Sequence, residues 1–198
     1  MPGGGVALEE LAAGLDRLDQ EPVGEPRLRA AGVLALIDPS DPGLPLLLLE
    51  RDRGLRDHPG QVGLPGGSHD AADGPLWRTA LREAEEELGV PSSAVQPLGY
   101  GLPVEVRHSG FLISPLVGVL RHHFTPRLQE TEVESCFWMP LRSAAVQVVN
   151  RDVSTHLGRL IAPGYLYQGH FVWGATGLVV DDLRRRLGQP IAGRPPTV

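Results

Sequence analysis

The segment 65–90 constrains the fold of this chain more than any other part of the sequence. Its second half repeats apolar or small residues at helical spacing, at Trp77, Ala80, Leu81, Ala84 and Leu88. A one-sided pattern of this kind predicts an amphipathic helix packed against a core. Asp73-Gly74-Pro75 supplies a turn and a start signal, and Gly89 supplies a stop. The segment therefore predicts a glycine-rich loop followed by a helix that lies on the core.

Three glutamates, Glu83, Glu86 and Glu87, lie off the apolar stripe of this helix. At about 100° per residue they fall on one side of it. Like charges three or four residues apart repel each other and destabilise an isolated helix. A bound divalent cation would remove that repulsion, and clustered carboxylates suit Mg²⁺ or Mn²⁺. A solvated acidic face is the alternative, and the periodicity alone does not decide between the two.

The sequence of residues 82–90, REAEEELGV, resembles the core of the Nudix box, REUxEExGU with U aliphatic. The upstream end departs from the family pattern. Ser68 stands at the position of the first Gly and Gly74 at that of the first Glu, with Asp73 one residue earlier. The chain is thus identified as similar to the Nudix hydrolases. This resemblance implies an α/β (α+β) fold, an α/β/α sandwich around a central mixed β-sheet, with Mg²⁺ or Mn²⁺ as cofactor.

The resemblance also implies a reaction, the attack of water on the pyrophosphate linkage of a nucleoside diphosphate derivative. Glu83 and Glu87 would be the first metal ligands, with Glu86 next, and Arg82 would orient these carboxylates by ion pairing. Glu132 aligns with a Glu that precedes Val in relatives, and it would be an extra ligand or the base that activates water. A solvated acidic side chain is the alternative for Glu132. The base is therefore either Glu83 or a downstream residue such as Glu132.

A second signature precedes the box. Residues 47–67, LLLERDRGLRDHPGQVGLPGG, resemble the motif LLTxR(S/A)xxxRxxxGxxxFPGG of the coenzyme A pyrophosphatase branch of the family. The matching positions are Leu47, Leu48, Arg51, Arg56, Gly60, Pro65, Gly66 and Gly67. Leu49, Asp52 and Leu64 depart from the motif. The resemblance favours coenzyme A as substrate.

The upstream motif carries cationic side chains that suit a polyphosphate ligand. Arg51, Arg53 and Arg56 would place three guanidinium groups beside an anionic metal site. The alternative is that each of them pairs with one of the surplus carboxylates. His58 would contact an adenine or a phosphate, or serve only the structure of its loop. Gly66-Gly67 would let the backbone approach the metal site closely, or form a plain tight turn.

Composition excludes several classes of function. Net charge is −6, so there is no basic surface for nucleic acid. The 18 basic residues are all Arg, which excludes Schiff-base chemistry on Lys. Cys136 stands alone, which excludes an intrachain disulfide and a cysteine zinc site. Without an apolar run of membrane-spanning length or a signal pattern, we expect a cytoplasmic protein with a small-molecule nucleotide as partner and no membrane contact. The sequence is consistent with either a monomer or a homodimer.

The order of patterns predicts one domain with additions at both ends. Residues 1–27 would form an amphipathic helix (6–19) and a linker, residues 28–187 the Nudix domain, and residues 188–198 a flexible tail. Strands are expected at 28–37, 46–49, 61–64, 95–106, 111–120 and 129–138. A short helical piece is expected at 139–141, a hairpin over 153–167 turning at Pro163-Gly164, and a closing helix at 172–187.

Three functions are consistent with these patterns. The first is a coenzyme A diphosphatase that yields 3',5'-ADP and a phosphopantetheine product. The second is a hydrolase of another nucleoside diphosphate derivative, such as ADP-ribose or NADH. The third is a non-catalytic Nudix module that senses a nucleotide for a partner. Loss of carboxylates from the box would favour the third, and here Glu83, Glu86 and Glu87 are all present.

Overall fold

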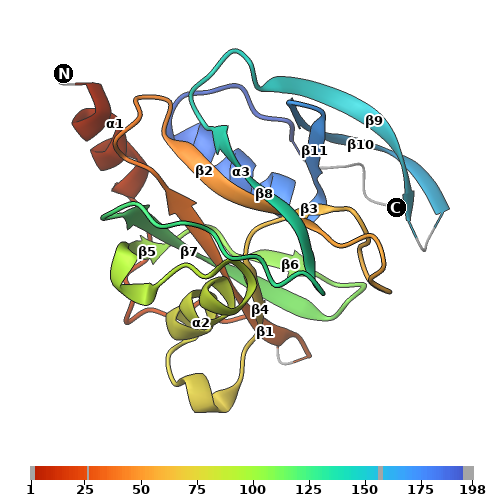
Figure 1. Cartoon of the computed structure of the whole chain (residues 1–198), viewed down its shortest axis with the longest axis horizontal. Helices are drawn as coiled ribbons and strands as arrows, with labels where there is room; N and C mark the ends of the chain where they lie inside the picture. Colours follow the sequence, from red (N-terminus) through yellow and green to blue (C-terminus); the bar gives the residue numbers. More distant parts are fainter. Residues whose placement is uncertain (1–2, 26, 156–157, 194–198) are drawn as a thin grey trace.

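The computed structural model describes residues 3–25, 27–155 and 158–193, with side chains from Ala7 onward (Figure 1). The helices are α1 (Gly3–Ala12), α2 (Leu76–Leu88) and α3 (Gly174–Arg186), with 3-10 turns η1 (Ala71–Asp73) and η2 (Ser92–Ala94). The strands are β1 (Arg29–Ile37), β2 (Pro45–Arg51), β3 (Val62–Gly63), β4 (Gly66–Ser68), β5 (Val95–Tyr100), β6 (Val104–Val106), β7 (Phe111–Leu120), β8 (Val133–Pro140), β9 (Gln147–Thr155), β10 (Gly158–Tyr167) and β11 (His170–Trp173).

A mixed sheet of eight strands forms the centre of the molecule. Its main path is β3-β2-β1-β7-β5, with β4 beside β1, β6 beside β7 and β8 beside β2. β1 and β7 run parallel over their whole length, from Arg29↔Phe111 to Ile37↔Val119, and the other pairs are antiparallel. The apolar run predicted at 28–37 becomes the buried β1 because both faces of this central strand are covered.

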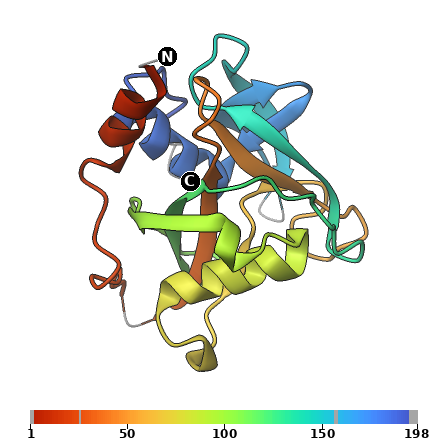
Figure 2. The ribbon, with the colours of Figure 1, turned by 60° about the vertical axis from the view of Figure 1, so that its left-hand side comes forward.

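Helices cover both faces of this sheet, and the side chains of β1 alternate between them. Leu34 and Leu36 pack into a core cluster with α2. Ala35 and Ile37 pack into the other cluster, which contains α1, α3 and the inner face of the small sheet β11-β10-β9. Figure 2 shows α2 below the sheet and α1 and α3 on the opposite side. The predicted α/β/α sandwich with a mixed central sheet is confirmed.

The N-terminal helix is shorter than the predicted 6–19. It ends at Ala12, and Gly14 at φ +81° turns the chain away from the helix axis. Asp16 then exchanges two backbone hydrogen bonds with Tyr100 of β5, at 2.9 and 2.8 Å. The apolar spacing continues past the glycine because Leu15 packs on the core from this extended segment.

Two predictions in the C-terminal third were wrong. Pro163-Gly164 lies inside β10, paired with Asn150 and Val149 of β9, and residues 156–157 between the two strands lie outside the described part of the chain. Gly164 is required for packing, since a Cβ there would lie 2.5 Å from the Val172 carbonyl oxygen. The predicted helical piece at 139–141 is the end of β8, where Met139 pairs with Leu46.

The closing helix begins at Gly174 rather than at 172, because β11 takes the residues before it. α3 ends with three arginines in its last turn, where cations suit the helix dipole. Of the predicted tail, residues 194–198 lie outside the described part of the chain. No helix in the described part has both the length and the apolar character needed to cross a membrane.

Candidate active site

The glycine-rich loop brings α2 close to the sheet. β4 pairs with β1, and its Gly66 has φ +153°, where a Cβ would lie 2.4 Å from the Gly32 carbonyl oxygen. A Cβ on Gly67 would lie 2.6 Å from the Glu83 carboxylate. A side chain at either position would therefore push the loop away from the strand or from the helix carboxylates.

Glu87 is the most buried carboxylate of the helix, with only 3% of its surface exposed. Its Oε2 accepts a hydrogen bond of 2.9 Å from the Gly66 backbone N–H. Burial raises the pKa of Glu87 to about 7, against the opposing effects of that hydrogen bond and of the Arg51 charge. The negative charges of Glu83 and Glu132 raise it further. The negative charge of Glu87 is therefore not fully compensated by the groups around it.

The pKa of Glu83 is raised by burial and by the Glu132 charge, as is that of Glu87. Burial raises its pKa above the usual value, the contact with Arg82 lowers it, and the charges of Glu86 and Glu132 raise it. Arg51, at the end of β2, faces this group, and its Nε is buried without a hydrogen-bond partner among the described residues. The site thus joins acidic groups with a cationic nitrogen that has no hydrogen-bond acceptor.

Arg82 is held by Asp73 of the turn η1. Its Nε and Nη2 donate to the two carboxylate oxygens of Asp73 at 2.8 and 3.2 Å. Nη2 also lies 2.8 Å from Glu83, and Nη1 donates to Glu86 at 3.0 Å. Asp73 accepts a further bond from the buried Thr79 hydroxyl at 2.8 Å. In this chain Asp73, one residue before the family's Glu position, is the acidic partner that fixes Arg82.

Replacing Asp73 by Asn should lower the free energy of unfolding at neutral pH. Hydrogen bonds from Arg82 are the largest cause of the fall in the Asp73 pKa from 3.8 to about 2. A carboxyl group whose pKa is lower in the folded state than in the unfolded state stabilises the fold at pH values above its unfolded pKa. This stabilisation is lost as the pH falls toward 2. We expect a loss of about 1 kcal/mol at neutral pH, because solvent partly screens Arg82.

Urea denaturation at neutral and strongly acidic pH measures this difference, which should vanish in acid. Asp19→Asn is the matched control, because its bond to Arg17 lies on the surface with the Asp19 side chain 66% exposed. That control should not change stability measurably. An equal loss of unfolding free energy in both variants would show that the Asp73–Arg82 pair contributes no more to stability than the surface pair of Asp19 and Arg17.

The three arginines of the upstream motif have different environments. Arg51 faces the carboxylates, as described above. Arg53 is exposed and bonded to Glu134 at 3.0 Å and to Glu50 at 3.2 Å. Arg56 is exposed and has no ion pair among the described residues. The structure therefore brings one of the three to the helix carboxylates.

His58 and Asp52 serve the loop between β2 and β3. His58 has φ +57°, and its Nδ1 lies 2.9 Å from the side-chain oxygen of Gln61. Asp52, a departure from the branch motif, accepts the Gly54 N–H at 2.7 Å and so closes a turn. Its charge is thereby partly satisfied within the loop.

Glu132 is brought to the helix by the segment before β8. The Gln129 N–H donates to the Glu87 carbonyl oxygen at 2.9 Å, which fixes this segment to the end of α2. The Glu132 side chain lies 3.3 Å from the Gln129 side-chain nitrogen. Its charge raises the pKa of both Glu83 and Glu87, so it belongs to the same acidic group.

The donor set fits a divalent cation that binds together with a phosphate ligand. Among the described residues, no three His, Cys, Asp or Glu side chains converge as a ready-made metal cage. Glu86 lies 3.0 Å from Arg82 with its side chain 53% exposed, and its charge raises the pKa of Glu83, so it borders this group from the solvent side. Mg²⁺ commonly uses one or two carboxylates and completes its shell with water and substrate phosphates. Glu83 and Glu87, both with pKa values raised by burial, match that pattern.

Comparison with known proteins agrees with this geometry. The family model described as the NUDIX domain matches residues 26–157. The Nudix hydrolase NudL of Yersinia enterocolitica is 40% identical over 148 residues, which cover 74% of this chain and 73% of the relative. NudL of Shigella flexneri is 33% identical over 184 residues, covering 87% and 88%.

A solved structure supports the fold. The MutT/nudix family protein of Enterococcus faecalis superimposes with a TM-score of 0.51 at 14% identity, over 86% of this chain and 66% of that one. The family model and the relatives match the segment that contains the loop, α2 and the buried carboxylates described above. The chain therefore belongs to the Nudix hydrolase family.

Proposed function

We propose that this protein hydrolyses the pyrophosphate bond of a nucleoside diphosphate derivative in a Mg²⁺- or Mn²⁺-dependent reaction, with coenzyme A or its derivatives as preferred substrate. The products would be 3',5'-ADP and a phosphopantetheine. The observation that carries the proposal is the group of Glu87, Glu83 and Glu132 beside the buried, unpartnered Arg51 nitrogen. A cation with an anionic phosphate ligand would satisfy both the carboxylates and the arginine.

The residues of the site would act as follows. A bound Mg²⁺ or Mn²⁺ supplies charge screening on the phosphates and a lowered pKa for the attacking water. Glu83 and Glu87 would hold the cation, and the Gly66 N–H orients Glu87. Arg82, fixed by Asp73, orients Glu83. Glu83 or Glu132 would take the proton of the water. Retention of these carboxylates disfavours a non-catalytic nucleotide sensor.

The preference for coenzyme A rests on the upstream motif and on the arginines. Coenzyme A carries a 3'-phosphate in addition to its pyrophosphate, so it needs a cationic group beyond those that serve the diphosphate. Arg53 already has two carboxylate partners, whereas Arg56 has none among the described residues. Arg56 is therefore the side chain that best suits the additional phosphate.

Coenzyme A should be cleaved with higher kcat/KM than dephospho-coenzyme A, and Arg56→Ala should narrow that gap. An arginine–phosphate contact contributes about 1–3 kcal/mol, which corresponds to a change of about 5- to 150-fold. The measurement is a substrate panel with Mg²⁺ or Mn²⁺, with products identified by mass. Arg17→Ala is the control, since the Arg17 side chain is exposed and pairs with Asp19 on the surface.

Two results would separate the parts of this proposal. If ADP-ribose or NADH is the better substrate and the 3'-phosphate makes no difference, the coenzyme A assignment is wrong and the hydrolase assignment stands. If no nucleoside diphosphate derivative is cleaved with either metal, the enzymatic assignment is wrong as well.

A further inference from the structure

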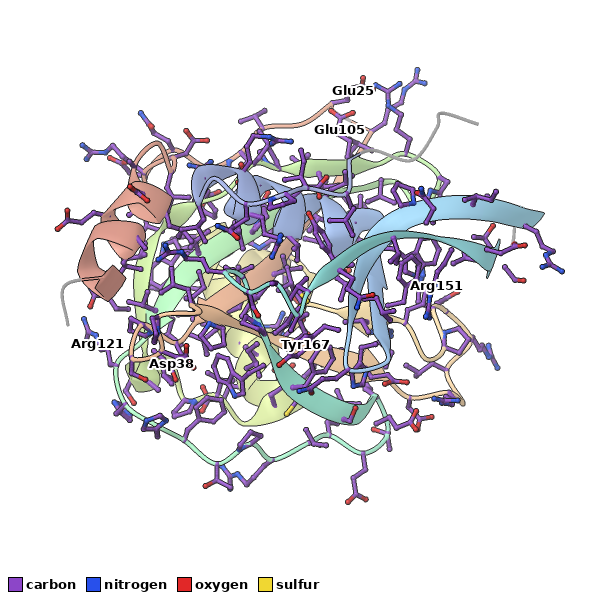
Figure 3. All side chains as sticks on the ribbon, turned by 90° about the horizontal axis from the view of Figure 1, so that it is seen from above. Glu25, Asp38, Glu105, Arg121, Arg151 and Tyr167 are labelled. Carbon is purple, nitrogen blue, oxygen red and sulfur yellow. The ribbon has the colours of Figure 1, made fainter. Side chains whose placement is uncertain are left out.

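A hollow of about 410 Å³ lies beside the end of β2. Its lining comes from β2 and the loop after it, from β3, and from β11: Glu50, Arg53, Gly60, Gln61, Val62, Gly169, His170, Phe171 and Trp173. This volume falls in the range of small-ligand sites. The small sheet that contributes β11 extends from the body of the molecule in Figure 3, where Arg151 of β9 is labelled.

One strand connects this hollow with the carboxylate site. The consecutive residues Glu50 and Arg51 lie at the end of β2, where the pairing with β8 shifts register between them. Arg51 acts on Glu87 of α2, whereas Glu50 contacts His170 of β11. Each region thus includes one of two consecutive residues of β2, which would let an extended ligand contact both.

Aromatic side chains form one wall of the hollow. The rings of Phe171 and Trp173 are nearly parallel, at 13°, with centroids 6.4 Å apart. The Arg151 guanidinium lies 5.6 Å from the Phe171 ring centroid. Both rings are only partly buried and line the same hollow, so they offer a surface on which a planar ring can stack.

A carboxylate on the opposite wall offers hydrogen-bond acceptors. Glu50 has a side chain only 13% exposed, and its two oxygens meet Arg53 at 3.2 Å and His170 Nδ1 at 3.1 Å. His170 is itself fixed by stacking on Phe137, with centroids 4.0 Å apart. A carboxylate can accept about four hydrogen bonds, so Glu50 keeps capacity for a donor on a ligand.

We infer that this hollow binds the base of the nucleotide substrate, a planar heteroaromatic ring that carries an amino group, as adenine does. The ring stacks on Phe171 and Trp173, and its amino group donates to Glu50. A phosphate does not suit the hollow, because its guanidinium, Arg53, is already shared by Glu50 and Glu134. The inference rests on the proposed function, which supplies the nucleotide and places its diphosphate at the carboxylates.

A second hollow does not offer this chemistry. It has a volume of about 510 Å³ and is lined by Pro42, Gly43, Arg142, Ser143, Ala144 and Gln189. It contains no aromatic ring for stacking and no carboxylate to accept from an amino group. Of these two, only the hollow beside β11 combines aromatic rings with a carboxylate.

The test is saturation-transfer NMR of AMP with the metal-free full-length protein, so that no turnover is required. The wild type should transfer saturation to the H2 and H8 protons of adenine. Phe171→Leu and Trp173→Leu should each abolish most of this transfer, because they remove a stacking ring and keep an apolar side chain. Phe111→Leu is the matched control, since Phe111 lies on β7 outside the hollow and should leave the transfer unchanged. IMP, which lacks the amino group, should compete less well than AMP.

Kinetics supply a second readout. Stacking of one base contributes about 1–3 kcal/mol, so KM for an adenine-containing substrate should rise about 5- to 150-fold in either ring variant. The value of kcat should change little, because the rings do not touch the reacting phosphates. Adenine saturation that persists in both folded variants, or that is missing in the wild type, would overturn the base site. Because AMP binding needs no hydrolysis, Glu87→Gln should keep the adenine signal, so a failure of the proposed reaction is distinguished from a failure of this inference.

Discussion

Glu87→Gln and Glu83→Gln should each lower kcat by about 10²- to 10⁴-fold while the protein stays folded. The lost contribution is charge stabilisation at the bound cation, which amounts to several kcal/mol, and each 1.36 kcal/mol corresponds to a factor of ten. Both side chains lie beside the glycine loop, and the Gln amide retains their size and the acceptor for the Gly66 N–H. Product formation at saturating Mg²⁺ or Mn²⁺, with folding checked by circular dichroism, measures the effect.

The matched control for this experiment is Glu85→Gln. Glu85 lies on the same helix, is exposed, and has no ion pair among the described residues. Its variant should turn over at the wild-type rate, which excludes a general effect of helix charge. Near-normal kcat in both folded Glu83 and Glu87 variants would contradict a metal-dependent site on α2.

The same Glu87→Gln change should make the metal-free protein more stable at alkaline pH. Burial raises the folded pKa of Glu87 from 4.5 to about 7, so ionisation is harder in the folded state than in the unfolded one. The folded state then binds more protons across this window, and stability falls as pH rises through it. Removing the charge should raise the free energy of unfolding by about 2–3 kcal/mol at about pH 8 and by almost nothing below about pH 4.

Urea denaturation of wild type and variant in the presence of a chelator measures this gain. Added Mg²⁺ or Mn²⁺ should stabilise the wild type, because a ligand that binds only the folded state raises the free energy of unfolding. The variant should respond much less to the same metal concentration. A variant that is less stable than the wild type at about pH 8 without metal would show that Glu87 is not held in a destabilising charged state.

The local elements could be predicted because their signals come from neighbouring residues. The apolar spacing from Trp77 to Leu88 predicts α2, which the structure begins one residue earlier, at Leu76. The apolar run at 28–37 predicts β1 almost to the residue. The predicted turn at Pro163-Gly164 failed because glycine there serves close packing against Val172, a contact between strands that no local pattern reveals.

The sequence by itself determined the family, the central helix, and the placement of Glu83, Glu86 and Glu87 on one side of it. Helix periodicity depends only on backbone geometry, so the spacing of residues fixes the face that they share. The tertiary structure alone decided how these charges are buried and paired. It buried Glu87 against the Gly66 N–H and placed Arg53 against two carboxylates. These contacts depend on strand register and on packing between segments far apart in the chain, and such pairings have no signature in a single sequence.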